Sequence, residues 1–275
     1  MQINFWIEYG IRLLSYSKTP RLDTELFISY VLRKSRTWIT IFDNFILNSD
    51  QIFLLKKLLY RRLCGEPVAY IICKKEFWSL SLLVSKDTLI PRSETEILVY
   101  HSLGRLKQGD YVLDLGTGCG AIALSIALEN PNCTIFGIDC INNAIQISKK
   151  NADNFNIKNV KFFYSNWFSC LNRKFNLIVS NPPYLSYNEK SSLSRELFFE
   201  PDIALFSKQH GISEIKYIIN HSKKYLFFNG WLLIEHGYKQ SKIVYQLFKK
   251  NNFYNIKTYQ DYLGYPRITV GQKIC

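Results

Sequence analysis

The sequence predicts an α/β protein: a doubly wound, mainly parallel sheet of seven strands with an antiparallel hairpin at one edge, preceded by a small N-terminal helical domain. From residue 110 onward, strand-like apolar runs alternate with helix-like segments, which is typical of a parallel sheet covered by helices. The last two strand-like segments, 253–260 and 267–272, have no helix between them, so we expect them to pair antiparallel.

The first part of the chain repeats its apolar side chains with the period of a helix. One apolar stripe predicts the first helix and comprises Ile3, Trp6, Ile7, Ile11 and Leu14. A second helix is expected to begin at Thr19, whose hydroxyl suits an N-cap. A third is expected to begin at Ser49 or Asp50 and to end at Gly65. Together these segments predict a helical bundle.

A connecting segment separates this bundle from the alternating part of the chain. Ser93 and Glu96 have the spacing of a capping box, so a further helix is expected to start near Ser93. We therefore predict a helical domain at 1–72, a linker with a short β-hairpin at 73–100, and the α/β domain at 101–275.

The composition points to a folded, cytoplasmic protein. Apolar residues make up 47% of the chain, yet no run approaches the roughly 18 apolar residues of a membrane span. The first residues, with Glu8 among them, do not resemble a signal peptide. The seven cysteines are odd in number and include no C-x-x-C pair, which favours reduced thiols over disulfides or a zinc site. We expect no metal and no membrane contact.

The chain is strongly basic. It has 35 Lys and Arg against 22 Asp and Glu, a formal charge of +13. The lysines are scattered, and Lys, Asn, Ile, Tyr and Phe are all plentiful, as an AT-rich genome would produce. We interpret the charge mostly as compositional background that adds modest steering toward a ribosomal partner.

A glycine-rich loop is the first candidate site. Gly116, Gly118 and Gly120 lie between a predicted strand and a predicted helix, where glycine lets a ligand approach the backbone. Asp139 ends the next strand and could accept hydrogen bonds from both hydroxyls of a ribose, or simply cap the following helix. The spacing also fits a dinucleotide fingerprint, so the loop predicts an adenosine-bearing cofactor without selecting one.

The second candidate site is the sequence Asn-Pro-Pro-Tyr at 181–184, which ends the fourth strand. Because ligands bind at the carboxyl ends of parallel strands, we expect this motif and the glycine loop to face one crevice. The motif resembles that of S-adenosylmethionine-dependent amino methyltransferases, whose target nitrogen is planar. The Asn181 side-chain carbonyl and the Pro182 backbone carbonyl would hold its two N–H groups, and Tyr184 would stack on the flat group.

An aromatic residue follows the third strand. Trp167 could pack on the adenine of the cofactor and Asn166 could contact the edge of the ring. On sequence alone, Trp167 serves equally well as a core or lid residue.

Six blocks along the chain carry a more specific resemblance: RRLCGEPVAYI, KEFWSLSLLVSKDTLIPRSETE, VLDLGTGCGAIALSIA, VSNPPY, EPDIAL and LLIEHGYKQ. Their order is similar to that of the release factor glutamine methyltransferase (PrmC/HemK) family over nearly the full length. The resemblance implies a class I methyltransferase fold. It also implies methylation of N5 of the glutamine in the Gly-Gly-Gln loop of peptide chain release factors, a step of protein methylation that serves translation termination.

The resemblance also implies roles for residues of this chain. The expected contacts of S-adenosylmethionine are Gly116, Thr117, Gly118, Cys119, Gly120, Asp139, Trp167 and Asn181. The expected contacts of the glutamine are Asn181, Pro182, Pro183 and Tyr184, with Asn181, Pro182 and Tyr184 as catalytic residues. The helical domain would dock the release factor, and we expect a monomer without stable nucleic acid.

The chain departs from the family pattern at three places. Ser93 stands where proline is usual, Asn166 where aspartate is usual, and 265–267 where an N-x-R sequence is frequent. Two rival functions follow. A nucleic-acid amino methyltransferase would use the positive charge to hold phosphates, and an inactive homologue would only bind a translation factor.

Overall fold

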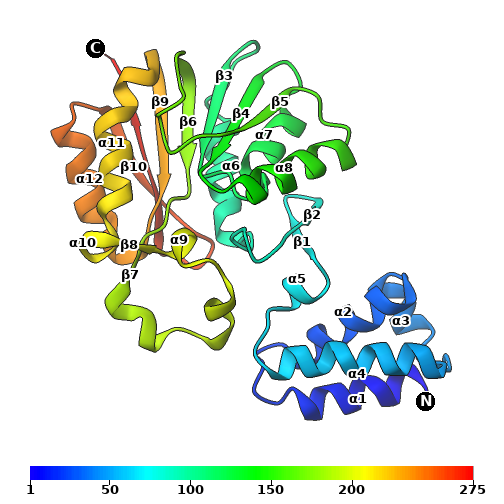
Figure 1. The fold of residues 1–275 in the computed structure, drawn as a ribbon. Coiled ribbons are helices and arrows are strands. Elements are labelled where there is room, and N and C mark those ends of the chain that lie inside the picture. Colours follow the sequence, from blue (N-terminus) through cyan, green and yellow to red (C-terminus); the bar gives the residue numbers. More distant parts are fainter. Residues whose placement is uncertain (275) are drawn as a thin grey trace. The chain divides into compact units, whose positions relative to one another are not determined.

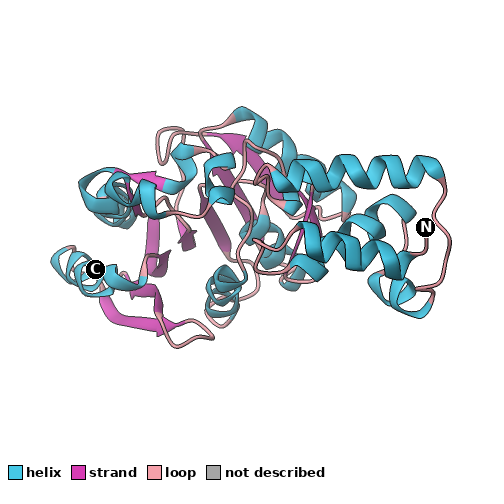
Figure 2. Cartoon of the chain, turned by 90° about the horizontal axis from the view of Figure 1, so that it is seen from below, coloured by secondary structure: helices cyan, strands magenta, loops and turns pink. Residues whose placement is uncertain are grey.

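The chain forms two compact units. The computed structural model describes residues 1–274, in which one unit comprises Met1–Lys74 with Ser194–Phe199 and the other comprises Lys75–Leu193 with the rest of the chain from Glu200 (Figure 1). In Figure 2 the first unit is largely helical, and the strands of the large sheet lie in the second. Within residues 1–274, the longest apolar helices fall short of what a membrane crossing requires.

The helical unit is a bundle with its own apolar core. Its helices are α1 (Ile3–Leu13), α2 (Pro20–Leu32), α3 (Arg36–Ile41), α4 (Ser49–Leu63) and α5 (Val68–Ile71). The predicted stripe packs inward at Ile3, Trp6 and Ile7, which are almost fully buried against Phe27 and Leu55. The short α3 was not predicted, because six residues give too little periodicity to detect.

The caps of these helices differ in part from the expected ones. Thr19 occupies the N-cap of α2, but its hydroxyl donates to the Asp23 carboxylate at 2.9 Å instead of capping the backbone. The N-cap of α4 is Asn48, which forms a capping box with Gln51, so the prediction of Ser49 or Asp50 was wrong by one or two positions. Gly65 follows α4 with φ of 95°, a conformation that favours glycine.

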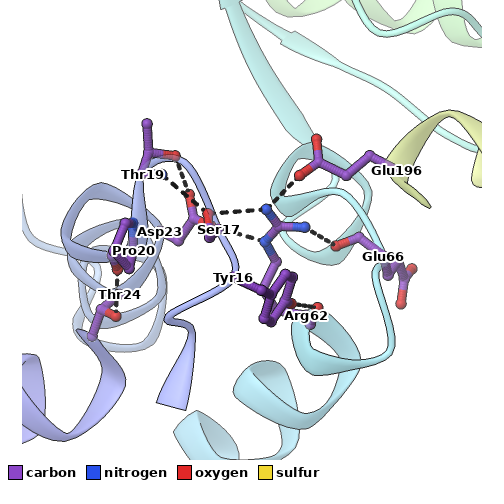
Figure 3. Close-up of polar contacts among 9 residues, drawn as sticks. All are labelled: Tyr16, Ser17, Thr19, Pro20, Asp23, Thr24, Arg62, Glu66 and Glu196. Carbon is purple, nitrogen blue, oxygen red and sulfur yellow. Dashed lines mark hydrogen bonds and ion pairs between the residues drawn. The ribbon is translucent and has the colours of Figure 1, made fainter. Parts of the chain in front are cut away.

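A buried arginine organises the polar interior of the helical unit (Figure 3). Arg62 of α4 is 3% exposed and forms an ion pair with Asp23 of α2, with 2.9 Å between Nε and Oδ2. Its guanidinium also reaches Ser17 and is paired with Glu196, which the chain supplies from the segment 194–199. One cation therefore joins three separate stretches of sequence within this unit.

The second unit is built on a seven-stranded sheet with the order β10-β11-β9-β6-β3-β4-β5. Its strands are β3 (Tyr111–Leu115), β4 (Thr134–Asp139), β5 (Val160–Tyr164), β6 (Phe175–Ser180), β9 (Leu226–Glu235), β10 (Tyr254–Gln260) and β11 (Pro266–Gln272). Strands β5, β4, β3, β6 and β9 are parallel, whereas β11 is antiparallel to both β9 and β10. The predicted α/β class, the parallel sheet and the antiparallel edge hairpin are confirmed.

Helices cover both faces of this sheet (Figure 1). They are α6 (Glu96–Leu103), α7 (Ala121–Glu129), α8 (Asn142–Asn154), α11 (Ser213–Tyr225) and α12 (Ser241–Lys250). Alternate strand residues such as Leu113, Ile138 and Ile234 form one core with the apolar faces of α11 and α12. The central strands β3, β4 and β6 are buried along most of their length, so they appear in the sequence as largely apolar runs.

Short elements precede α6 and follow β6. They are β1 (Lys74–Phe77), β2 (Leu80–Leu83), η1 (Ser93–Thr95), β7 (Leu185–Ser186), η2 (Tyr187–Ser192), η3 (Arg195–Phe199), α9 (Asp202–Leu205), β8 (Phe206–Ser207), α10 (Lys208–Gly211) and η4 (Tyr238–Gln240). The expected capping box at Ser93 was wrong. Ser93 is exposed and begins a 3-10 turn without a side-chain cap. The Glu96 carboxylate instead accepts from the backbone N–H of Trp78 at 2.9 Å.

Candidate active site

The two predicted motifs leave neighbouring strands at the same end of the sheet. In the parallel ladders, Leu115 of β3 pairs with Ser180 of β6 and with Ile138 of β4. The glycine loop, the Asn-Pro-Pro-Tyr motif and Asp139 therefore start side by side. The chain runs from β3 outward through β4 and β5 and then returns to β6 on the other side of β3, so the site lies at a topological switch point.

A cavity of 720 Å³ opens at this edge of the sheet. Of the predicted site residues, the cavity is lined by Gly116, Thr117, Gly118, Cys119, Asp139, Asn166, Trp167, Asn181, Pro182 and Pro183. Gly120 and Tyr184 are not among the lining residues. Gly120 lies behind the loop, where an added Cβ would come within 3.1 Å of Phe162 and Ser148.

The glycine loop is held open by two carboxylates. Asp139 accepts from the backbone N–H of Gly118 through Oδ2 and from that of Ile141 through Oδ1, each at 2.9 Å. Asp114, fully buried in β3, accepts from the Thr117 hydroxyl at 2.6 Å and from the backbone N–H of Ala123. These contacts fix a loop whose Gly118, with φ of 55°, turns bare backbone toward the cavity.

Burial changes the acidity of both carboxyls. Desolvation raises the pKa of Asp114 to about 7, against hydrogen bonds from Thr117 and Ala123. Desolvation also raises the pKa of Asp139, against backbone N–H groups that include those of Gly118 and Ile141. The carboxyl of Asp139 thus loses its charge at a higher pH than an ordinary aspartate does.

Trp167 forms the wall opposite the loop. Its backbone is left-handed, with φ of 49°, and its indole N–H donates to Glu214 of α11 at 3.1 Å. A Cβ on Gly116 would lie 3.7 Å from the indole ring. Glycine at this position therefore leaves the space between the loop backbone and the indole free of a side chain. The structure thus places Trp167 at the cavity and not in the core alone, and Asn166 lines the cavity beside it.

Asn181 is fixed at one end of its amide. Its side-chain Nδ2 donates to the Thr95 hydroxyl at 3.1 Å, and both residues line the cavity. The N–H end of the amide is therefore engaged by the protein, while the carbonyl end remains for a ligand. This is the arrangement that an acceptor for a substrate N–H group requires.

Tyr184 lies behind the cavity wall. Its hydroxyl donates to Glu235 of β9 at 3.3 Å, and its backbone carbonyl accepts from the Gln240 side chain at 2.9 Å. Burial, followed by the nearby Glu235 carboxylate, raises the pKa of Tyr184, so the phenol stays protonated. Stacking of Tyr184 on the target amide stays a prediction.

Several residues around the site were missed by sequence reasoning. Glu200 is buried, accepts from the backbone N–H of Ile90 at 3.0 Å and pairs with Arg92, which lines the cavity. The others are Thr95, Asp114, Glu214 and Glu235. Glu200, Thr95 and Glu235 stand in EPDIAL, IPRSETE and LLIEHG, so the quoted blocks contained the signal without showing which residues meet.

The comparisons with known proteins agree with this geometry. A family model described as a methyltransferase domain matches residues 106–269, and one described as the PrmC N-terminal domain matches residues 6–72. The chain is 51% identical to a release factor glutamine methyltransferase of Buchnera aphidicola subsp. Acyrthosiphon pisum (strain APS) over 99% of each chain. It is 40% identical to the protein of that name from Escherichia coli (strain K12), again over 99% of each.

The solved structures give the same fold. A methyltransferase from Pyrococcus furiosus superposes with a TM-score of 0.55 at 16% identity, over 70% of this chain and 89% of that one. The fold and the matched methyltransferase domain together define a class I methyltransferase. The sequence identity to these relatives extends over the whole chain and so includes the helical unit, which a methyltransferase domain alone does not contain. The chain belongs to the release factor glutamine methyltransferase family.

Proposed function

We propose that this protein transfers a methyl group from S-adenosylmethionine to the side-chain amide nitrogen, N5, of the glutamine in the Gly-Gly-Gln loop of peptide chain release factors. The observation that carries the proposal is the Asn181 amide, whose N–H end is bound by Thr95 beside the cavity and whose carbonyl end is left for a substrate N–H. The matched helical unit and the names of the full-length relatives support a release factor as the substrate.

The residues of the cavity fit S-adenosylmethionine. The volume of 720 Å³ lies in the range of small-molecule sites. Asp139 would hold the ribose hydroxyls, the backbone from Gly116 to Gly120 would pass close to the methionine part, and Trp167 would cover the adenine. The cofactor supplies an electrophilic methyl group on a positively charged sulfur.

The protein's own contribution is to hold a weak nucleophile in position. An amide nitrogen is weak because its lone pair is delocalised, so alignment within the site supplies much of the catalysis. The Asn181 side-chain carbonyl and the Pro182 backbone carbonyl would each accept one N–H of the glutamine. Both hydrogen bonds strengthen as positive charge develops on the nitrogen, which lowers the barrier selectively. The released proton would leave to water.

We assign the parts of the chain accordingly. Residues 1–72 would dock the body of the release factor, 73–100 would connect, and 101–275 would carry out the transfer. We propose that the protein acts as a monomer in the cytoplasm, without stably bound nucleic acid and away from membranes.

The function is tested with labelled S-adenosylmethionine. Release factor, RNA and DNA are offered in parallel, together with a release factor whose Gly-Gly-Gln glutamine is replaced by alanine. We expect label on the intact release factor and none on the substituted one. Label on RNA or DNA alone would support the nucleic-acid alternative, and cofactor binding without any transfer would support the inactive homologue.

Asp139→Asn should weaken cofactor binding by about 10- to 100-fold, the magnitude of a lost charge-assisted hydrogen bond. Asparagine would place its NH₂ group against one of the two backbone N–H groups that now donate to Asp139, so one of these two hydrogen bonds would be lost. Because the pKa of Asp139 is raised, wild-type affinity should also fall as the pH is lowered through that raised pKa. Calorimetric titration with S-adenosylmethionine measures both effects.

The exposed Asp153 of α8 provides the matched control. Asp153→Asn should leave the dissociation constant unchanged. Equal affinity of Asp139→Asn and wild type would remove Asp139 from the cofactor site.

A further inference from the structure

A glutamine behind the Asn-Pro-Pro-Tyr motif joins three stretches of the chain. Gln240 ends η4, and its side-chain Nε2 donates to the backbone carbonyl of Tyr184 at 2.9 Å. The same Nε2 lies 3.4 Å from the backbone carbonyl oxygens of His210 and Gly211. The Oε1 of this amide accepts from the backbone N–H of Gly237 at 2.9 Å. Because its carbonyl end is engaged in this way, the amide must turn its N–H end toward Tyr184.

Glycine at position 211 allows the chain to pack closely against Tyr184. Gly211 has φ of 83°, in the left-handed region, and a Cβ there would come within 2.1 Å of the Tyr184 carbonyl oxygen. Gln209 and His210, which precede it, are also left-handed, with φ of 53° and 56°. The chain thus uses three consecutive left-handed residues to reach Tyr184. Backbone strain of this kind clusters at functional sites, so we looked for a function of the contact.

The Asn-Pro-Pro-Tyr loop is held by the protein at both ends. At its start the Asn181 side chain is bound to Thr95, and at its end the Tyr184 carbonyl accepts from Gln240. Between these anchors, the two proline rings fix φ at positions 182 and 183. Few dihedral angles remain free, so the positions of the two anchors determine where the backbone carbonyl of residue 182 points.

We propose that Gln240 is a positioning residue: by holding the Tyr184 carbonyl beside Gly211, it fixes the direction in which the Pro182 carbonyl faces the target nitrogen. The inference rests on the proposed function, in which the Pro182 carbonyl accepts an N–H of the glutamine. Gln240 is not among the residues that line the cavity, so it acts through the loop and not by contact with substrate or cofactor. Loosening this end of the loop should slow methyl transfer, because small errors of alignment are costly.

Gln240→Glu tests the contact with almost no change in shape. The introduced carboxylate can still accept from Gly237, but it places an acceptor against the Tyr184 carbonyl, where a donor now lies. We expect kcat for methyl transfer to release factor to fall by about 10- to 100-fold. The KM for release factor and the dissociation constant of S-adenosylmethionine should change by less than about 3-fold. Steady-state kinetics and calorimetric titration measure these quantities separately.

Gln272 provides the matched control for this substitution. It ends β11 and pairs with Trp231, at the end of the sheet opposite to the cavity. Its Nε2 donates to the backbone carbonyl of Asn229 at 3.0 Å, and its Oε1 accepts from the Asn255 side chain. Gln272→Glu therefore makes the same chemical change at the same kind of contact and should keep the kcat of wild type.

Three results of this comparison would overturn the inference while leaving the proposed function intact. They are wild-type kcat in Gln240→Glu, an equal loss of kcat in Gln272→Glu, and a loss of kcat that an equal weakening of cofactor binding accompanies. The last result would mean that the substitution disrupts the whole site and not the alignment of one carbonyl.

Gly211→Ala tests the same contact from its other side. The added methyl group would press on the Tyr184 carbonyl, so kcat should again fall by at least about 10-fold. Gly109, which lies before β3, has φ of 85°, and a Cβ there would meet no atom of residues 1–274 within 4 Å. Gly109→Ala thus imposes the same backbone strain without the contact and should keep the kcat of wild type. Equal kcat in the two variants would contradict the inference.

The proposed function fails in a different way. If wild type labels RNA or DNA instead of release factor, the same variants are compared on that acceptor. The expected changes in kcat are the same, because a planar amino group of a base would need the same carbonyl. An absence of label on every acceptor would overturn both the proposed function and this inference.

Discussion

Replacing Asn181 by alanine is expected to lower kcat for methyl transfer by about 100- to 1,000-fold, the usual loss when one preorganised polar group of an active site is removed. The side-chain carbonyl of Asn181 is the acceptor whose hydrogen bond gains most as charge develops on the target nitrogen. Its removal also leaves the Thr95 hydroxyl without the amide it now accepts from. The affinity for S-adenosylmethionine should change by less than about 10-fold, because Asp139 and the glycine loop supply most of that binding.

The measurement combines steady-state kinetics with cofactor titration, and the same strand offers a control. Asn176 lies on β6 at the opposite end from Asn181, where its side-chain carbonyl accepts from the backbone N–H of Tyr111 at 2.9 Å. Asn176→Ala therefore removes an asparagine and a hydrogen bond without touching the cavity. A loss of kcat in Asn181→Ala no larger than in Asn176→Ala would show that Asn181 is not the acceptor.

The largest effect on stability is expected at Arg62. Arg62→Leu leaves the Asp23 carboxylate, 6% exposed, without its cation in the interior of the helical unit. Breaking a buried ion pair on one side costs about 3–5 kcal/mol, because the remaining charge stays desolvated. The Asp23 oxygens would keep only the hydroxyls of Ser17 and Thr19 as donors from side chains. We expect the free energy of unfolding of this unit to fall accordingly.

Native-state hydrogen exchange of the intact chain measures the free energy of unfolding of the helical unit by itself. It does not require that the two units unfold together in one transition. Arg21→Ala is the control, since Arg21 is 66% exposed in its pair with Glu25 and should cost at most about 1 kcal/mol. The double variant Asp23→Leu/Arg62→Leu should regain part of the loss. Equal protection in Arg62→Leu and Arg21→Ala would mean that the buried pair does not hold the unit together.

The sequence predicted what depends on local pattern. Strand and helix periodicity gave the sheet and its edge hairpin, and the rule for parallel strands placed the glycine loop beside Asn181. Contacts between residues far apart in the sequence could not be predicted in this way. The Thr95 hydroxyl and the Asn181 amide are 86 positions apart, and the residues around either one do not indicate the other. Helix caps also failed at Asn48, because several adjacent polar residues could serve equally well at that position.

The polar contact of the Tyr184 side chain was not predicted from the motif. An aromatic residue beside two prolines predicts a stacking surface, and that role stays a prediction. The motif did not indicate that the phenol hydroxyl donates to the buried carboxylate of Glu235 on β9. A buried Tyr hydroxyl needs a hydrogen-bond partner, and Glu235 provides it. Sequence spacing alone does not state which polar groups become buried.

The helical unit is discontinuous in sequence, and this matters to anyone who recombines such enzymes. Residues 194–199 belong to it, and their Glu196 meets Arg62 although 134 positions separate the two. A chimera that exchanges only the first 74 residues would separate the two segments that make up this unit. Exchanging both segments together should preserve the contact between Arg62 and Glu196. The helical unit is therefore one structural module that two separate stretches of the gene encode.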